Sequence, residues 1–158
     1  DPAGGIAPAP IVHGVAEFLK EGPDGALVAY GAMVDECWRA AALLKDTGID
    51  VTVVNARFAR PIDQAMVAKV MRSGPLVMTV EDHQAACGFG ALFAKAAADC
   101  DASRQGARLV VRGIPDRLIT HGTPAEQYRD AGLTAAQIAD GYREALAADK
   151  RGAKRVSA

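Results

Sequence analysis

Three polar residues, Glu81, Asp82 and His83, stand together directly after an apolar run of the chain. Two carboxylates beside an imidazole are the groups that general acid–base catalysis uses. The cluster also fits two structural roles: a polar contact to a neighbouring domain or subunit, and a cap for a helix that begins near Phe89. Successive strand residues point to opposite faces, so the three side chains converge only if the backbone turns. We therefore expect a structural or interface role.

The segment 88–90, Gly-Phe-Gly, lies just before a predicted helix, whose free N–H groups are able to bind an anion. It lacks the third glycine of a dinucleotide-binding fingerprint, and a polar loop separates it from the preceding strand. We expect a close backbone approach instead. Cys87 is the cysteine best placed to react, because a helix N-terminus stabilises a thiolate. Nothing else marks it as a nucleophile, so we expect inert packing, as for Cys37 on the inward face of its helix.

Arg117 and His121 flank a short apolar stretch in a loop after Pro115. An arginine there can hold a phosphate or a carboxylate, and a salt bridge across a domain interface is the reading we favour. The sequence contains no phosphate-binding loop, zinc-ligand spacing, nucleophile elbow or catalytic triad. From the residues alone, we expect a domain without a self-sufficient active site.

The elements that position these residues alternate between strands and helices. Buried strands are predicted at 26–30, 51–55, 76–80 and 108–112, with a first strand at 11–18. Helices are predicted at about 33–45, 63–72, 89–99 and 124–128, and from 135 onward. This order predicts an α/β fold of three layers, α/β/α, around a mostly parallel five-stranded sheet that allows one antiparallel strand at an edge. Ligands bind such a sheet beyond the carboxyl ends of its strands.

Length, composition and charge limit the classes of function that this chain can have. The chain has 158 residues, a net charge of −1 and 5% aromatic residues, which disfavours nucleic acid as a partner. No apolar stretch approaches the length of a membrane span, and the N-terminus lacks the pattern of a signal peptide. The three cysteines have neither disulfide nor zinc spacing, so a reducing cytoplasm is expected.

The chain divides into three parts by composition. Residues 1–10, rich in Pro, Gly and Ala, are predicted to be a linker; residues 11–148 form the domain; residues 149–158 are predicted to be a basic, flexible tail. The chain begins without a methionine, so we expect it to be a fragment of a longer protein.

Four segments resemble one family in order and spacing. ALVAYGAMVDECWRAAALL (26–44), VTVVNARFARPID (51–63) and VEDHQAACGFG (80–90) are similar to the C-terminal domain of transketolase-type enzymes. IPDRLITHGTPAEQYRDAG (114–132) closely resembles the run Pro-Asp-Arg-Phe-Ile-x-His-Gly-Ser/Thr-Pro-x-Glu-Gln of 1-deoxy-D-xylulose-5-phosphate synthases. The chain departs from the family at Cys87, where Gly is usual, and at Leu118, where Phe is common.

The resemblance implies a parent enzyme that condenses pyruvate with glyceraldehyde 3-phosphate and releases carbon dioxide, for isoprenoid, thiamine and pyridoxal synthesis. The diphosphate of thiamine diphosphate and Mg²⁺ would be held by the N-terminal domain, and the glutamate that activates the aminopyrimidine ring would lie in the middle domain. No catalytic, cofactor-binding or metal-binding residue is therefore assigned to this chain. The parent is expected to be a cytoplasmic homodimer, or plastidic in a plant.

Within that parent, this domain would contact the other domains or the second subunit. The candidate residues for those contacts are Glu81, Asp82, His83, Arg117 and His121. Two alternatives stay open: the C-terminal domain of a transketolase or of a 2-oxoacid dehydrogenase β-subunit, and a stand-alone module that binds a small anion.

Overall fold

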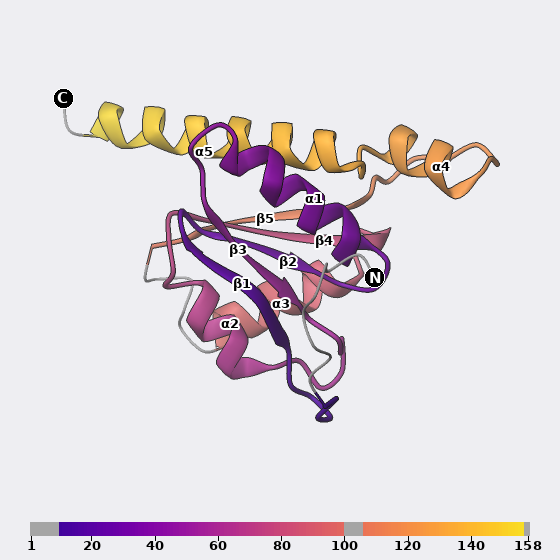
Figure 1. Ribbon diagram of the computed structural model, residues 1–158, viewed down its shortest axis with the longest axis horizontal. Coiled ribbons are helices and arrows are strands. Elements are labelled where there is room, and N and C mark those ends of the chain that lie inside the picture. Colours follow the sequence, from indigo (N-terminus) through magenta and orange to yellow (C-terminus); the bar gives the residue numbers. More distant parts are fainter. Residues whose placement is uncertain (1–9, 100–105, 157–158) are drawn as a thin grey trace.

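A computed structural model of the chain describes residues 10–99 and 106–156, and for 149–156 it describes the backbone alone. Almost all of the predicted linker, and Cys100, lie outside these residues. Within the described residues the chain forms ten elements (Figure 1): β1 (Glu17–Pro23), β2 (Ala26–Ala29), α1 (Met33–Lys45), β3 (Val51–Asn55), α2 (Gln64–Val70), β4 (Leu76–Gln84), α3 (Phe89–Asp99), β5 (Arg108–Ile114), α4 (Pro124–Ala131) and α5 (Ala135–Val156).

The strands of the described residues form one five-stranded sheet in the order β1-β3-β2-β4-β5. β2 lies in the centre and pairs in parallel with both β3 and β4. β5 continues the parallel part beside β4, whereas β1 pairs antiparallel with β3 at the opposite edge. The predicted α/β fold, mostly parallel with one antiparallel edge strand, is confirmed.

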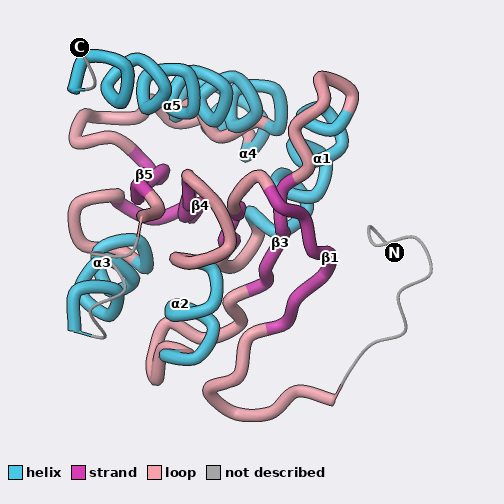
Figure 2. Tube along the Cα trace, turned by 90° about the vertical axis from the view of Figure 1, so that its left-hand side faces the viewer, coloured by secondary structure: helices cyan, strands magenta, loops and turns pink. Residues whose placement is uncertain are grey.

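Helices cover both faces of the sheet, as the continuous apolar strands require. α1 and α5 lie on one face, and α2 and α3 lie on the other (Figure 2). Each face has its own hydrophobic cluster: Met33, Leu44 and Tyr142 belong to the first, and Val67 and Phe93 to the second. The two clusters sandwich the sheet and complete the three layers.

Three predicted helix starts, those of α2, α4 and α5, are confirmed by side-chain caps. Asp63 Oδ1 accepts a hydrogen bond from the backbone N–H of Met66, 2.9 Å away, at the start of α2. Thr123 and Glu126 form a reciprocal capping box at the start of α4. Thr134 and Gln137 exchange the same pair of bonds at the start of α5.

Several strand boundaries differ from the sequence prediction, and β1 and β4 differ most. The first strand was expected at 11–18 but begins at Glu17, because a turn closed by Val15 N–H and the carbonyl of Val12 precedes it. β4 was expected to end at Val80 but continues to Gln84, since β5 runs beside it and Gln84 pairs with Ile114. The residues after Val80 therefore begin as strand rather than as a loop.

The C-terminal end also differs. α5 continues to Val156 and so includes most of residues 149–158, which were expected to form a flexible tail. Its Ala, Lys and Arg residues are good helix formers, and the helix is already nucleated at its capped start. Among the described residues, no helix has the length and apolar character needed to cross a membrane.

Tyr142 fixes α5 to the sheet. Its buried hydroxyl lies 2.8 Å from the carbonyl oxygen of Asp24 and 3.0 Å from that of Leu76.

We expect Tyr142→Phe to lower the free energy of unfolding by about 1–3 kcal/mol, because buried carbonyl oxygens lose their donor. Urea unfolding followed by circular dichroism measures this. Tyr128→Phe is the control, expected to change stability by less than about 0.5 kcal/mol, because the Tyr128 hydroxyl is more exposed. Equal stability of Tyr142→Phe and the unmodified chain would contradict the assignment.

Candidate functional site

The carboxyl ends of β2, β3, β4 and β5 meet at one edge of the sheet, where a parallel α/β fold binds its ligands. Most of the candidate residues named from the sequence lie at the end of β4 or in the loops that follow β4 and β5, whereas Cys37 lies in α1. We call this side of the molecule the carboxyl edge. α4 lies at the end of the molecule toward which β4 points (Figure 1).

Glu81 caps helix α3 from inside the domain. Its side chain is fully buried. One carboxylate oxygen accepts from the backbone N–H of Phe89 at 2.5 Å, and the other accepts from that of Gly90 at 2.8 Å. Two N–H groups that the first turn of a helix leaves unpaired are thereby satisfied, and the positive end of the helix dipole faces the carboxylate. Of the three roles open to this residue, the structure shows the helix cap.

Two glycines make room for this carboxylate. A Cβ atom on Gly88 would lie 1.9 Å from Glu81 Oε2. A Cβ atom on Gly90 would lie 2.4 Å from Val111 Cγ1 and 2.7 Å from Thr79 Oγ1. All three distances are shorter than any ordinary van der Waals contact. The expected close backbone approach at 88–90 is confirmed, and the N-terminus of α3 is occupied by the protein's own carboxylate.

Asp82 and His83 do not join Glu81. Because β4 is extended here, Asp82 points to the opposite face, where the Tyr128 hydroxyl donates to its carboxylate over 3.4 Å. Partial burial of Tyr128, and then the nearby charge of Asp82, raise the pKa of the Tyr128 hydroxyl. His83 is exposed. The three side chains therefore do not converge into an acid–base group. This agrees with the expectation that successive residues of a strand point to opposite faces.

Arg117 is bound within the domain. Its guanidinium contacts both carboxylate oxygens of Asp130, at 2.8 and 3.1 Å, and donates to the Asp130 carbonyl at 2.6 Å. This bidentate pair ties the loop after β5 to α4. The hydrogen bond from Arg117 lowers the pKa of Asp130, and the same bond raises the pKa of Arg117. Arg117 and Asp82 line one hollow of about 470 Å³, together with Tyr128.

The remaining sequence candidates are dispersed. His121 is exposed in the loop between β5 and α4. The packing expected for Cys87 is wrong, because this residue is exposed, with its sulfur 3.8 Å from the side-chain oxygen of Gln84. Cys37 is fully buried in α1, and this burial raises the pKa of its thiol, as expected of an inert cysteine.

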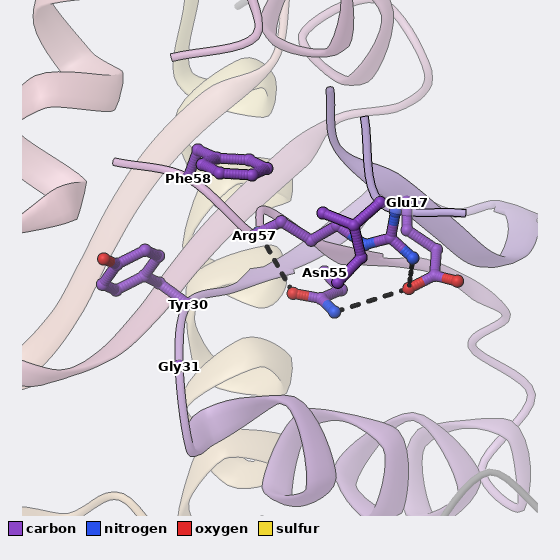
Figure 3. A pocket seen from close by; sticks show the side chains of 7 residues that line it. Glu17, Tyr30, Gly31, Asn55, Arg57 and Phe58 are labelled. Carbon is purple, nitrogen blue, oxygen red and sulfur yellow. Dashed lines mark hydrogen bonds and ion pairs between the residues drawn. The ribbon is translucent and has the colours of Figure 1, made fainter. Parts of the chain in front are cut away.

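A second cavity lies at the carboxyl edge; the sequence places 31–32 and 57–60 beyond strand ends there but did not predict the cavity. It has a volume of about 460 Å³ and lies where β2 and β3 end (Figure 3). Its lining residues are Ile11, Glu17, Tyr30, Gly31, Asn55, Arg57 and Phe58. The sequence signal was the position of Arg57 and Phe58 directly after a strand. The signal was incomplete because Glu17 comes from the other, antiparallel strand.

Arg57 organises this cavity. Its guanidinium contacts the Glu17 carboxylate at 2.8 Å, with both side chains mostly buried. Its backbone N–H donates to Asn55 Oδ1 at 3.1 Å, and the amide nitrogen of Asn55 lies 3.5 Å from Glu17 (Figure 3). Arg57 has a φ of +57°, a left-handed conformation that costs a non-glycine residue about 1–2 kcal/mol. The surrounding contacts hold this strained residue in place.

The carboxyl edge does not have the residues of a metal centre. Within the described part of the chain, no group of three or more His, Cys, Asp or Glu side chains is arranged to hold a cation. The charged groups pair within the domain instead: Glu81 with the α3 backbone, Arg117 with Asp130, and Arg57 with Glu17. These residues do not fit a diphosphate–Mg²⁺ site.

Comparison with protein families identifies the family to which this domain belongs. The family model described as the C-terminal domain of transketolase matches residues 14–138, which includes β1 to β5 and the start of α5. The chain belongs to the transketolase C-terminal domain family. The broad resemblance seen in the sequence is thereby confirmed.

Curated relatives of this transketolase C-terminal domain carry the name 1-deoxy-D-xylulose-5-phosphate synthase. The chain is 42% identical over 127 residues to the synthase of Synechococcus sp. strain CC9605, covering 80% of this chain and 19% of that protein. It is 41% identical over 139 residues to the synthase of Rhodopirellula baltica, covering 87% and 21%. The chain thus spans about a fifth of the length of these relatives.

Solved structures confirm the fold. A split-gene transketolase, whose description reads "inactive beta4 tetramer", matches with a TM-score of 0.78 and 28% identity. The match covers 87% of this chain and 44% of that one. The transketolase of Campylobacter jejuni matches with a TM-score of 0.55 and 19% identity, over 82% of this chain and 18% of that one. The second match shows the shared fold alone.

The buried cap makes a testable prediction. We expect Glu81→Gln to lower the free energy of unfolding by about 1–3 kcal/mol, because an amide group then faces one of the two N–H donors of α3 and the charge at the helix dipole is lost. Chemical denaturation measures the loss. The neighbouring control, Asp82→Asn, is expected to change stability by less than about 0.5 kcal/mol. Equal losses in the two variants would contradict the role of Glu81.

The Arg117–Asp130 pair makes a prediction about pH. Since the pKa of Asp130 is lower in the folded state than in the unfolded chain, its stabilising contribution is present above the unfolded pKa of about 3.9 and is lost as pH falls through the folded value. We expect Arg117→Ala to raise the pKa of Asp130 toward that ordinary value. Carboxyl-detected NMR titration of both proteins measures it. An unchanged titration curve in the variant would refute this pairing.

Proposed function

We propose that this chain is the C-terminal domain of a 1-deoxy-D-xylulose-5-phosphate synthase, a transferase that condenses pyruvate with glyceraldehyde 3-phosphate and releases carbon dioxide. The observation that carries the proposal is 41–42% identity to two such synthases over 80–87% of the chain. Identity to the split-gene transketolase is 28%. The run at 114–132, which forms the end of β5 and all of α4, is the segment most specific to these synthases.

In this proposal the domain contributes to assembly rather than chemistry. Thiamine diphosphate and Mg²⁺ are bound by the N-terminal and middle domains of the same enzyme, in a cytoplasmic homodimer. The paired charges of the carboxyl edge support this division, because each is already neutralised within the domain.

Four of the five candidate contact residues remain suited to an interface. Asp82, His83, Arg117 and His121 are exposed at the carboxyl edge, and we propose that they face a neighbouring domain or subunit. Glu81 is withdrawn from this group, because its carboxylate is fully buried and both of its oxygens accept hydrogen bonds from α3.

The decisive experiment compares the complete gene product with this 158-residue chain. With thiamine diphosphate and Mg²⁺, we expect the complete product to form 1-deoxy-D-xylulose 5-phosphate from pyruvate and glyceraldehyde 3-phosphate, measured by coupled assay and release of labelled carbon dioxide. The isolated chain is expected to show no turnover. Ketol transfer from xylulose 5-phosphate to ribose 5-phosphate by the complete product would instead identify a transketolase. High-affinity phosphate binding by the isolated chain would favour a stand-alone anion-binding module.

His121 tests the assembly role. In the complete enzyme, we expect His121→Ala to change dimer assembly or thermal stability more than the affinity for thiamine diphosphate, because the cofactor is bound elsewhere. Sedimentation, thermal melting and cofactor titration of both proteins measure this. A variant that stays folded and dimeric but no longer binds thiamine diphosphate would contradict the prediction.

A further inference from the structure

Residues 10–16, which we call the N-terminal turn, are held firmly against the loop that joins β3 to α2. The turn is closed by Val15 N–H donating to the Val12 carbonyl at 3.1 Å. The backbone N–H of Ala16 then donates to Asp63 Oδ2 at 2.9 Å, while the other oxygen of Asp63 caps α2. The position of the turn is therefore coupled to the start of a core helix.

Further contacts with the same loop hold the turn. The ring of His13 packs edge-on against Phe58, with centroids 5.3 Å apart and planes at 76°. Arg57 donates to the carbonyl of Pro10 over 3.4 Å. Gly14 has a φ of +76°, and a Cβ atom there would lie 2.9 Å from Pro61, so the backbone passes close to the loop. The turn is fixed in backbone and in side chain.

The aliphatic side chains of this fixed turn nevertheless point into solvent. Ile11 is 75% exposed, Val12 is 56% exposed and Val15 is 44% exposed. Ile11 also forms part of the rim of the cavity beside Tyr30 and Phe58. A fixed backbone that presents three aliphatic groups outward is typical of a preorganised interaction surface.

The electrostatics of this surface define the kind of partner. The charged groups beneath it, Arg57 and Glu17, neutralise each other, and their side chains are only 13% and 19% exposed. The surface therefore offers apolar contact and a cavity, without a net charge from this pair to attract a charged ligand. An apolar protein surface is the partner that fits it.

The length of the relatives identifies that partner. This domain corresponds to about a fifth of the synthases it matches, and the matching family is a C-terminal domain. For a C-terminal domain we expect the remaining length to precede it, and the N-terminal turn is the first described segment that a preceding domain would meet. We propose that the N-terminal turn and the cavity at Arg57 form the surface on which the preceding domain of the same polypeptide docks. This inference rests on the proposed function, since that function supplies the preceding domain.

Hydrogen–deuterium exchange of the complete gene product and of the 158-residue chain tests the proposal. We expect the backbone amides of residues 11–14 to exchange at least tenfold more slowly in the complete product. The double variant Ile11→Asp, Val12→Asp should remove that protection, while the melting temperature of the isolated chain stays within about 2 °C, because exposed positions contribute little to stability. Leu43→Asp, which replaces a 41% exposed leucine on α1, is the matched control and should leave the protection intact.

Several results would overturn the proposal. They are equal exchange in the two proteins, protection that survives the double variant, and protection found at residues 115–122 but not at 11–14. A gene product with no domain upstream of this chain would also overturn it. The proposed function fails separately: a complete product that protects residues 11–14 but forms no 1-deoxy-D-xylulose 5-phosphate keeps the docking surface and loses the synthase assignment.

Discussion

The central strand β2, Ala26–Ala29, is buried completely on both faces, and the rest of the domain follows from that constraint. A strand with no solvent-facing side must be paired at both edges and covered by helices above and below. β3 and β4 supply the pairing, and α1, α5, α2 and α3 supply the cover. Within the described strands, the buried polar side chains are the uncharged Thr52 and Thr79, together with Glu81 near the carboxyl end of β4. The charged groups of the candidate site lie at the carboxyl edge, where the strands end.

At the carboxyl edge, each charged group that enters the protein has an internal partner. Burying a carboxylate without hydrogen bonds is costly. Glu81 avoids that cost because both of its oxygens accept backbone N–H groups at the positive end of α3. Gly88 and Gly90 are part of the same arrangement, since any side chain there would displace the carboxylate or the helix. The edge that holds ligands in many α/β proteins is here used to join β4 to α3.

The same principle accounts for the role we propose for the domain. Arg57 with Glu17, and Arg117 with Asp130, are pairs that organise loops rather than groups left free for a substrate. The exposed residues around these pairs include aliphatic ones: Ile11, Val12 and Val15 at one end of the edge, and Leu118 at the other. A domain with neutralised charges and exposed aliphatic groups at its loops is suited to packing against another part of a larger enzyme.

The sequence by itself determined the order of the elements, the parallel character of the sheet and the helix starts. Apolar runs and caps such as Asp63 and Thr123 act within a few residues, so their effect is readable locally. The sequence also indicated that the backbone packs closely at residues 88–90. It placed the end of β4 too early, because the pairing of Gln84 with Ile114 depends on a strand 30 residues away.

Only the tertiary structure decided which candidate polar residues act together. Glu81 and His83 have similar surroundings in the sequence, yet one is buried as a helix cap and the other is exposed. The cavity at Arg57 was not readable, since it joins β1 to the end of β3 across an antiparallel pairing. The physical reason is the same in both cases. Which side chains contact each other depends on how elements that are far apart in the chain pack together. Local sequence patterns contain no information about that packing.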